Sequence, residues 1–366
     1  MRARLLGLPA IAAALLAFGA QSAAAAGTGT VFVQSDNLEG NSVVVYDRAA
    51  DGTLNPAHTY PTGGKGGQLV GSVADHLASQ GSLVYDRSAK TLLAVNAGSN
   101  TVAVFAVHGD RLALRQDISS GGSFPASITV HRNLVYVLNA EAGGSLQAYR
   151  LKAGELTALG APTPLGLPEE APQFVHTPGE VTFSPSGRQL IVTTKATTNA
   201  VLVFHVGQAG ALSSEVENPS GTPVPFAATF DRQGHLLVVD AGGQLADYSL
   251  ASSGKLTQLD TTATNQAASC WLVYSHGYAY VSNAGSATIG TFAAFDGGQL
   301  YELLGNTEAG HGTVDATVAG GGHFLYVQAG AEGLVDEYRI ESTGTPVPIG
   351  TLTVPGGAGG EGIAAG

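Results

Sequence analysis

The chain has 366 residues, of which 16 are Lys or Arg and 28 are Asp or Glu, so its formal net charge is −12 at pH 7. Such an acidic chain lacks the positive surface that attracts nucleic acids and anionic membranes, and we expect neither as a partner. The single cysteine, Cys270, excludes an internal disulfide framework, so the core must come from the 44% hydrophobic content.

The first 26 residues have the pattern of a secretory signal peptide. Arg2 and Arg4 precede the apolar run LLGLPAIAAALLAFGA, which is followed by the small-residue stretch SAAAAG. The run contains Pro9 and is short for a membrane span. We therefore predict cleavage near Ala26 and an exported protein, periplasmic or extracellular, with one domain over residues 27–366.

The rest of the chain is a repeat of short strands. Segments such as LLAVNAGSNTVAVFAV, LIVTTKATTNAVLVFHV and YAYVSNAGSATIGTFAAF align as strand, polar turn and strand, and seven such segments occur. Each is preceded by another apolar segment and followed by a weaker alternating one, which gives four strands per unit at a spacing of roughly 45 residues. We predict an all-β fold, a seven-bladed β-propeller of four-stranded blades. The first unit lacks its leading strand, so the C-terminal EGIAAG should complete blade 1 and close the ring.

Two connections between blades are longer than the others. They contain GGKGGQLVGSVADHLASQ and GAPTPLGLPEEAPQFVHTPG, and both join a fourth strand to the next first strand. Such connections surround the mouth of a propeller channel. The first insertion, which carries Lys65, either folds over the mouth as a lid or is a plain mobile loop.

The stretches QGSLVYDRSAKTLLAVNAGSN, VTFSPSGRQLIVTTKATTNAVLVF and CWLVYS resemble the secreted branch of the seven-bladed β-propeller lactonase family. The resemblance covers essentially everything after residue 26. That family is similar to 6-phosphogluconolactonases and carboxymuconate-lactonising enzymes, so the resemblance implies a channel pocket in which a lactone ring is opened or closed. Because propellers host many functions, the fold follows from this resemblance more directly than the activity does.

The blade register places one tier of polar residues near the mouth. The residues that end the second strands are Ser35, Asn96, Asn139, Lys195, Asp240, Asn283 and Gln328. We predict substrate binding for the three asparagines and Asp240, although Asn and Asp also cap turns. Lys195 either forms an ion pair with Asp240 or polarises a substrate carbonyl.

The starts of the innermost strands give a second tier: Ser82, Ser127, Glu180, Ala227, Trp271, Asp315 and Gly362. Glu180 and Asp315 occupy the same register in blades 4 and 7, and His176 and His311 precede them in the connecting loops. The alternative roles are channel lining for the carboxylates and solvated loop positions for the histidines.

These positions give a catalytic hypothesis. Glu180 or His176 is the general base that activates water, and Lys195 with the asparagines holds the developing oxyanion. Asp315 and His311 orient the substrate or protonate the leaving alkoxide.

Two further residues are candidates for substrate binding. Gln80 enters through the first insertion. Trp271 is either a stacking platform for a ring-shaped ligand or a wide plug of the channel. Cys270 is interpreted as a buried small hydrophobe.

Most Arg and Lys residues fall in turns on the face opposite the mouth, which leaves Lys65 and Lys195 near it. A phosphorylated sugar lactone would need several charge-assisted donors. We therefore predict an unphosphorylated lactone or ester as the substrate of a hydrolase or a lactonising cyclase. The acidic rim could supply oxygen ligands to Ca²⁺, but no spacing specifies such a site, and no other cofactor is expected.

The alternative function is a non-catalytic secreted propeller that binds a small ligand or a partner protein on its acidic face. It follows from the lack of any strong catalytic motif and would show saturable binding without turnover. In either case we expect a monomer.

Overall fold

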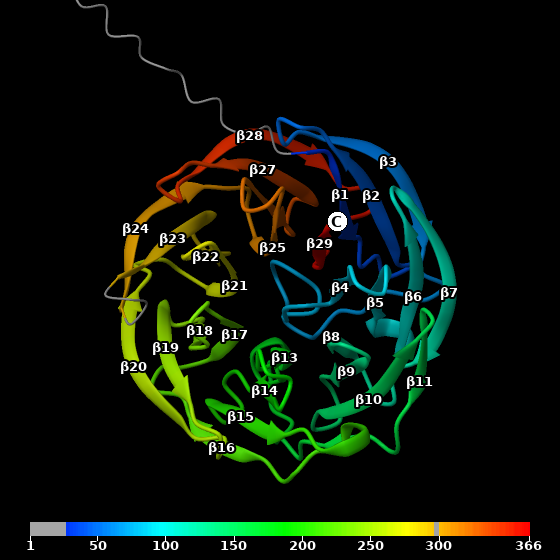
Figure 1. Ribbon diagram of the computed structural model, residues 1–366, viewed down its shortest axis with the longest axis vertical. Helices are drawn as coiled ribbons and strands as arrows, with labels where there is room; N and C mark the ends of the chain where they lie inside the picture. Colours follow the sequence, from blue (N-terminus) through cyan, green and yellow to red (C-terminus); the bar gives the residue numbers. More distant parts are fainter. Residues whose placement is uncertain (1–26, 296–299) are drawn as a thin grey trace, which may run out of the picture.

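The computed structural model describes residues 27–295 and 300–366, and the predicted signal peptide lies outside the described residues. Seven antiparallel sheets are arranged in a ring as the blades of a propeller, with their first strands innermost (Figure 1). The all-β, seven-bladed prediction is confirmed. None of the helices in the described part of the chain is long and apolar enough to span a membrane.

Blades 1 to 4 are built from residues 29–219, together with the C-terminal strand β29. Blade 1 contains β1 (Gly29–Gln34), β2 (Ser42–Arg48), β3 (Leu54–Pro61) and β29 (Ile363–Ala365). Blade 2 contains β4 (Leu83–Asp86), β5 (Thr91–Asn96), β6 (Thr101–His108) and β7 (Arg111–Ser119). Blade 3 contains β8 (Pro125–His131), β9 (Leu134–Asn139), β10 (Ser145–Lys152), β11 (Glu155–Ala158) and β12 (Thr163–Pro164). Blade 4 contains β13 (Glu180–Phe183), β14 (Gln189–Thr193), β15 (Ala200–His205) and β16 (Val216–Pro219).

Blades 5 to 7 complete the ring. Blade 5 contains β17 (Pro225–Phe230), β18 (Leu236–Asp240), β19 (Gln244–Leu250) and β20 (Leu256–Ala263). Blade 6 contains β21 (Ser269–Ser275), β22 (Tyr278–Asn283), β23 (Thr288–Phe295) and β24 (Leu300–Glu308). Blade 7 contains β25 (Thr313–Ala319), β26 (Phe324–Ala329), β27 (Leu334–Ile340) and β28 (Pro346–Thr353). The described 3-10 helices are η1 (Ala97–Ser99), η2 (Gln173–Val175) and η3 (Gln208–Gly210).

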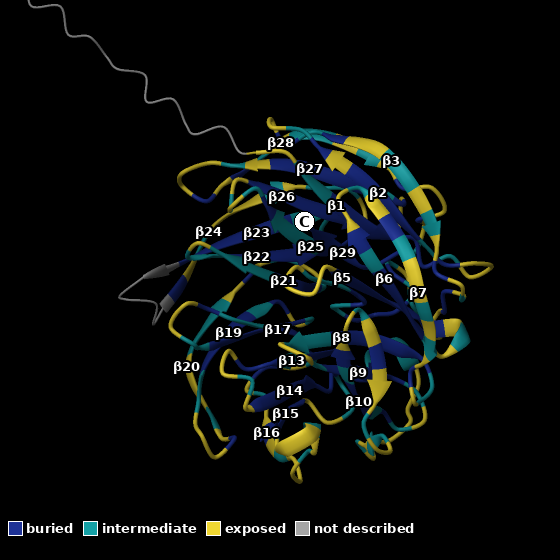
Figure 2. Cartoon of the chain, turned by 45° about the vertical axis from the view of Figure 1, so that its right-hand side comes forward, coloured by how far each residue is buried: buried dark blue, intermediate teal, exposed yellow. Residues whose placement is uncertain are grey.

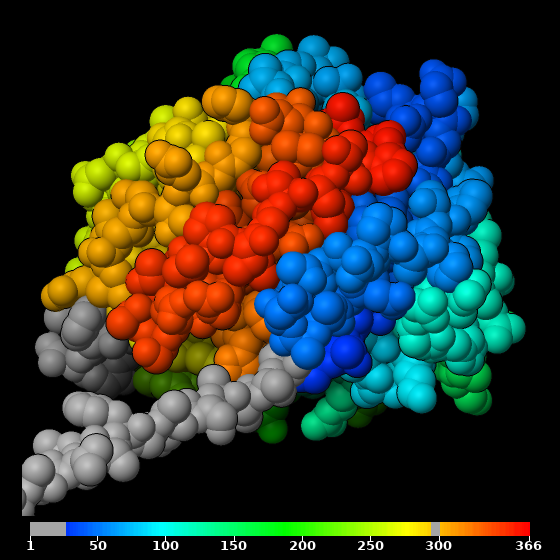
Figure 3. All heavy atoms as spheres, turned by 90° about the horizontal axis from the view of Figure 1, so that it is seen from above, coloured from blue at the N-terminus to red at the C-terminus, as the bar shows by residue number. Residues whose placement is uncertain are grey.

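The C-terminal strand closes the ring. β29 pairs antiparallel with β1, with Ala365 opposite Val31 and Ile363 opposite Val33. Figure 3 shows the consequence on the outside, where the red of the last blade lies against the blue of the first. The predicted closure is therefore confirmed, and a sheet edge that would otherwise be open is paired.

Burial follows the strand order within each blade. The second strands are buried on both faces, as in β5, because they are covered by the neighbouring blades. The outer strands β3 and β7 alternate between exposed and covered residues, and Figure 2 shows their exposed positions along the rim. This difference explains why the fourth strands show only weak alternation in the sequence.

Buried tyrosines tie neighbouring blades together on the face opposite the mouth. The hydroxyl of Tyr326 in blade 7 donates to the carbonyl of Gly52 in blade 1 at 2.6 Å. Tyr280 of blade 6 donates in the same way to Gly344 of blade 7 at 3.0 Å. Gly52 has a φ of 95°, a left-handed conformation that glycine adopts without strain, so the turn can present its carbonyl to the ring.

Tyr326→Phe is expected to lower the free energy of unfolding by about 1 kcal/mol, because it leaves the Gly52 carbonyl without this donor. Urea denaturation measures the change. Tyr60→Phe on β3 is the matched control, since that ring is not fully buried, and should change the free energy by less than about 0.5 kcal/mol. Equal losses in the two variants would contradict a role for the inter-blade bond.

Several innermost strands begin with a β-bulge at the same height. The register shifts between Pro125 and Ser127 in β8, between Pro225 and Ala227 in β17, and between Ser269 and Trp271 in β21. A bulge bends the strand start and re-aims its side chains. The bulges therefore fall at equivalent positions, at the starts of the innermost strands of blades 3, 5 and 6.

Candidate functional site

The first insertion, residues 62–82, is a lid over the channel mouth. Figure 1 shows this segment, before β4, in the middle of the ring. The backbone N–H of His76 donates to Gly359 O at 2.8 Å, and the backbone N–H of Gln80 donates to Gly179 O at 3.1 Å. The Ser79 hydroxyl donates to Ala126 O at 2.8 Å. Because these contacts reach different blades, the lid alternative holds and the mobile-loop alternative does not.

Gln80 fixes the lid to blade 6. Its Oε1 accepts from Leu272 N at 2.7 Å, and its Nε2 donates to Leu272 O at 3.0 Å. The side-chain amide thus pairs with the backbone of β21 much as a neighbouring strand would. Gln80 was predicted to bind substrate, but its amide is engaged in holding the lid.

Lys195 joins the two insertions. Its Nζ donates to Ala78 O and Phe174 O, each at 2.7 Å, and to Thr177 Oγ1 at 3.1 Å. The side chain is fully buried, and that burial lowers the pKa of its ammonium to about 8. The first acceptor belongs to the lid and the other two to the second insertion. Lys195 is therefore the residue that holds both insertions over the mouth.

The predicted ion pair between Lys195 and Asp240 is wrong. The two side chains make no ion pair in the structure, because the ammonium is committed to the insertions. The Asp240 carboxyl instead lies beside the Thr222 hydroxyl, and burial raises its pKa to about 6.

An apolar pocket of about 190 Å³ opens beside the lid, above blades 4 to 6. Its only charged lining groups in the described structure are Asp75 and Lys195. Its other large lining residues are Val73, Phe174, Val175, Val224, Phe226 and Trp271. We refer to it as the apolar pocket.

Trp271 forms one wall of the apolar pocket. Its ring packs against Phe226 with a centroid separation of 4.9 Å and an interplanar angle of 57°. Its indole N–H donates to Ser79 O of the lid at 2.5 Å. The tryptophan is therefore an apolar wall of the pocket and also an anchor of the lid, and its stacking role toward a ligand stays a prediction.

Cys270 lines the same pocket and is buried. Burial raises the pKa of its thiol well above the ordinary range, so the sulfur stays protonated at neutral pH. The interpretation as a small buried hydrophobe is consistent with this environment.

Asp75 of the lid and three carboxyl groups of the blades and the C-terminal segment, Glu180, Asp315 and Glu361, form a group that we call the acidic cluster. All four are buried, with exposed fractions of 7% or less. Burial, the hydrogen bond to Asp75 and the charge of Asp75 raise the pKa of Glu361 well above its ordinary range. Burial and the neighbouring Asp75 therefore favour the neutral form of Glu361, which can donate to Asp75.

Glu180 is also a weak acid in this setting. Burial raises its pKa to about 8, with a smaller contribution from the charge of Asp315. Its Oε2 accepts from Ala228 N at 2.6 Å, and Gln80 Nε2 donates to its Oε1 at 3.5 Å. Glu180 does not line the apolar pocket. A carboxyl with this pKa is mostly protonated at pH 7. A general-base role for Glu180 stays a prediction that this environment disfavours.

Asp315 is the other predicted carboxylate of the inner tier. Its Oδ1 accepts from Ala316 N at 2.9 Å, and burial raises its pKa to about 7. His311 precedes it but is exposed, and its backbone N–H donates to Glu332 Oε2 at 2.9 Å. The side chains of His311 and Asp315 therefore occupy different environments, one at the surface and one in the channel.

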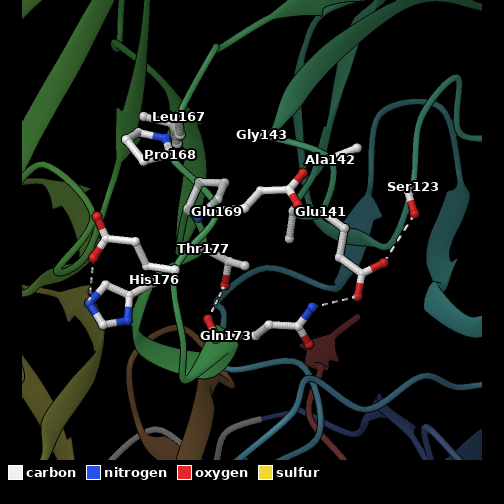
Figure 4. Close-up of a pocket in the computed structure, with 13 residues that line it drawn as sticks. Ser123, Glu141, Ala142, Gly143, Leu167, Pro168, Glu169, Gln173, His176 and Thr177 are labelled. Carbon is white, nitrogen blue, oxygen red and sulfur yellow. Dashed lines mark hydrogen bonds and ion pairs between the residues drawn. The ribbon is translucent and has the colours of Figure 1, made fainter.

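His176 belongs to a separate outer pocket of about 260 Å³ between blades 3 and 4 (Figure 4). Its Nε2 lies 3.5 Å from Glu170 Oε2, and its Nδ1 lies 3.1 Å from Pro172 O. Glu141, on the other side, accepts from Ser123 Oγ and Gln173 Nε2. His176 and Glu180 thus do not share a pocket, although only three residues separate them.

The ring asparagines are engaged in turns and blade contacts. Asn96 donates from Nδ2 to Thr101 Oγ1 at 3.2 Å, Asn139 donates to Ser120 O at 3.1 Å, and Asn283 donates to Thr288 Oγ1 at 3.1 Å. All three are fully buried. The arrangement supports the turn-capping alternative, and their substrate-binding role stays a prediction.

Metal ligands were part of the sequence hypothesis. Within residues 27–295 and 300–366, no three His, Cys, Asp or Glu side chains are grouped as a metal site. Glu180 and Asp315 have raised pKa values, which makes them poor Ca²⁺ ligands near neutral pH. The Ca²⁺ site stays a prediction without support from this geometry.

Sequence reasoning missed the importance of Asp75 and Glu361. Neither was given a role from the sequence. Asp75 lies in the first insertion, which has no counterpart in other blades, so the repeat gave it no register. Glu361 immediately precedes the closing strand, and that position was the one signal that could have placed it at the channel.

Comparisons with known proteins agree with the geometry. Residues 38–170 match a family model described as lactonase, 7-bladed beta-propeller, and no curated protein matches. A periplasmic gluconolactonase of Pseudomonas aeruginosa is 18% identical, with a TM-score of 0.74 over 92% of this chain and 99% of that one. A candidate 6-phosphogluconolactonase of Bacteroides fragilis is 17% identical, with a TM-score of 0.74 over 94% and 99%. At these identities the structures establish the fold, and the family match over residues 38–170 confirms the predicted resemblance to the seven-bladed β-propeller lactonases.

Proposed function

We propose that the chain is an exported hydrolase that opens an uncharged, largely apolar lactone or ester in the apolar pocket. The observation that carries this proposal is a pocket with apolar walls and one carboxylate and one ammonium among its lining residues. The lactonase family match supports the reaction class. The sequence of the first 26 residues supports export, as does the periplasmic location named for the Pseudomonas aeruginosa protein.

The pocket chemistry separates candidate substrates. No arginine lines the apolar pocket, and the hydrogen bonds of Lys195 are made to the protein. A phosphate would find few donors there. The many hydroxyls of a sugar lactone would face carbon, and unpaired buried polar groups are costly. A ring with an alkyl or aryl substituent would instead pack against Trp271 and Phe226.

Hydrolysis would proceed by attack of water on the lactone carbonyl and cleavage of the ring C–O bond. Negative charge then develops on the carbonyl oxygen. Lys195 supplies positive potential at the wall of this apolar pocket without giving up its bonds to the insertions, and electrostatic stabilisation is stronger beside apolar walls than in bulk water.

Filling the pocket tests its location. Ala284 is a small lining residue, and Ala284→Phe is expected to lower kcat/KM for alkyl-substituted lactones at least about tenfold by occupying the substrate volume. Proton release at constant pH measures turnover. Ala251→Phe, at an exposed site on the opposite face, should leave kcat/KM unchanged. A normal rate in Ala284→Phe would place the reaction elsewhere.

A non-catalytic ligand-binding propeller is the second candidate. It is favoured by the commitment of the Lys195 donors and by the protonated thiol of Cys270. Trp271 is the chain's only tryptophan and lines the pocket, so its fluorescence reports occupancy directly. Saturable quenching by apolar lactones without any proton release would establish the binding function instead of the hydrolase.

A further inference from the structure

We propose that Asp75 is the catalytic base of the apolar pocket and that Glu361, hydrogen-bonded to it, is the residue that positions it. This inference rests on the proposed hydrolase function and names the group that activates water. It concerns a residue of the lid, and not one of the strand-end residues that the blade repeat singles out.

Asp75 is the one carboxylate among the described lining residues of the apolar pocket. Its Oδ2 accepts from Ala78 N at 2.5 Å, which closes a tight turn of the lid and fixes the carboxylate. The side chain is almost entirely buried and lines the apolar pocket. A fixed carboxylate at the wall of an apolar cavity has the geometry required of a general base.

Glu361 supports Asp75 from outside the pocket. Ser79 donates to it twice, from Oγ to Oε1 at 2.7 Å and from N to Oε2 at 3.2 Å. Glu361 is fully buried and shares a hydrogen bond with Asp75. Two carboxyl groups in this contact must share a proton, because two buried like charges would repel. This contact, together with the hydrogen bond from Ala78 N, fixes the Asp75 carboxyl at the pocket wall.

The other ionisable groups nearby do not fit the role. The Lys195 ammonium donates to three protein acceptors, so it offers no lone pair. The Cys270 thiol is protonated at neutral pH because of its burial. Glu180 lies outside the pocket lining, and His176 lines the outer pocket.

The reaction balances with these groups. Asp75 removes a proton from water while the water oxygen bonds to the lactone carbonyl carbon. The ring C–O bond then breaks, and its electron pair remains on the leaving oxygen as an alkoxide. Asp75 returns the proton to that oxygen and becomes ionised again. The product is the hydroxy acid, formed by net addition of one water molecule, which releases a proton when it ionises.

Four single variants of the mature protein test the inference with an alkyl-substituted lactone. Asp75→Asn keeps the acceptor for Ala78 N but cannot remove a proton from water, so kcat should fall at least about 100-fold. Its affinity, read from Trp271 fluorescence, should change less than about threefold. Asp36→Asn is the control, since Asp36 is a buried carboxyl near Asp75 that lies outside the pocket lining, and its kcat should be retained.

Glu361 has a matched pair of variants. Glu361→Gln can still donate to Asp75 and accept from Ser79, so it should keep kcat within about threefold. Glu361→Met can neither donate to Asp75 nor accept from Ser79. It should lower kcat about tenfold and shift the acid limb of the plot of kcat/KM against pH. A purely structural role would leave that limb in place.

The outcomes distinguish the assignment of Asp75 as the base from the proposed hydrolase function. Wild-type turnover with an unimpaired Asp75→Asn would overturn Asp75 as the base and leave the hydrolase standing. No wild-type turnover of any apolar lactone would overturn both. Loss of ligand-dependent quenching in Asp75→Asn, with turnover lost only through weaker binding, would also overturn the catalytic assignment.

Discussion

Raising the pH from 5 to 8 is expected to lower the free energy of unfolding by several kcal/mol. Burial raises the pKa of Glu180 to about 8 and that of Asp315 to about 7, and it raises the pKa of Glu361 as well. The folded state therefore binds these protons more tightly than the unfolded state, in which carboxyl pKa values are near 4. The stabilisation is fully present below about pH 4 and is lost as the pH rises through 7 to 8. Each fully differing group contributes about 1.4 kcal/mol per pH unit.

Urea denaturation at pH 5, 6, 7 and 8 measures this dependence. The double variant Glu180→Gln with Asp315→Asn replaces two titrating groups by neutral amides of similar shape, so it should flatten the profile. Exposed carboxylates provide the comparison, since Glu155→Gln on β11 should leave the profile unchanged. A wild-type stability that rises between pH 5 and 8 would contradict the raised pKa values of Glu180, Asp315 and Glu361.

Lys195→Met is expected to lower the free energy of unfolding by about 2–4 kcal/mol and to free the lid. The substitution removes three charge-assisted hydrogen bonds and leaves the carbonyls of Ala78 and Phe174 without their donor. Both insertions should then exchange amide hydrogens faster and become more sensitive to limited proteolysis. The apolar pocket lies between them, so lactone binding should weaken as well.

The fluorescence of Trp271 reports release of the lid independently of hydrogen exchange and proteolysis. Its indole N–H contacts the lid at Ser79, and a released lid would expose the ring and shift its emission to the red. Lys152→Met, at an exposed lysine of β10, should change neither stability nor emission. If Lys195→Met behaves like Lys152→Met, Lys195 does not hold the insertions.

The blade repeat made the architecture predictable. Alternating strands at a fixed period can bury their faces only by stacking, and an incomplete first unit requires a closing strand from the other end. β29 supplies that strand, next to β1. The register also placed Glu180 and Asp315 correctly at the channel, because equivalent positions in equivalent blades face the same way.

The side-chain partners of the site were not predictable in the same way. Lys195 follows the end of β14 with a φ of 51°, a turn conformation outside the strand register, and its side chain meets the lid rather than Asp240. The lid itself has no repeat partner to supply its register. Asp75 and Glu361 come together from nearly opposite ends of the chain, and no local sequence pattern encodes such a contact.

The most direct measurement of the central claim is kcat/KM of the protein for an alkyl-substituted lactone, compared with gluconolactone and 6-phosphogluconolactone. The apolar walls and the absence of arginine from the pocket lining predict that the alkyl lactone is preferred at least about 100-fold. An equal or greater value for the phosphorylated lactone would contradict the apolar pocket as the site of reaction.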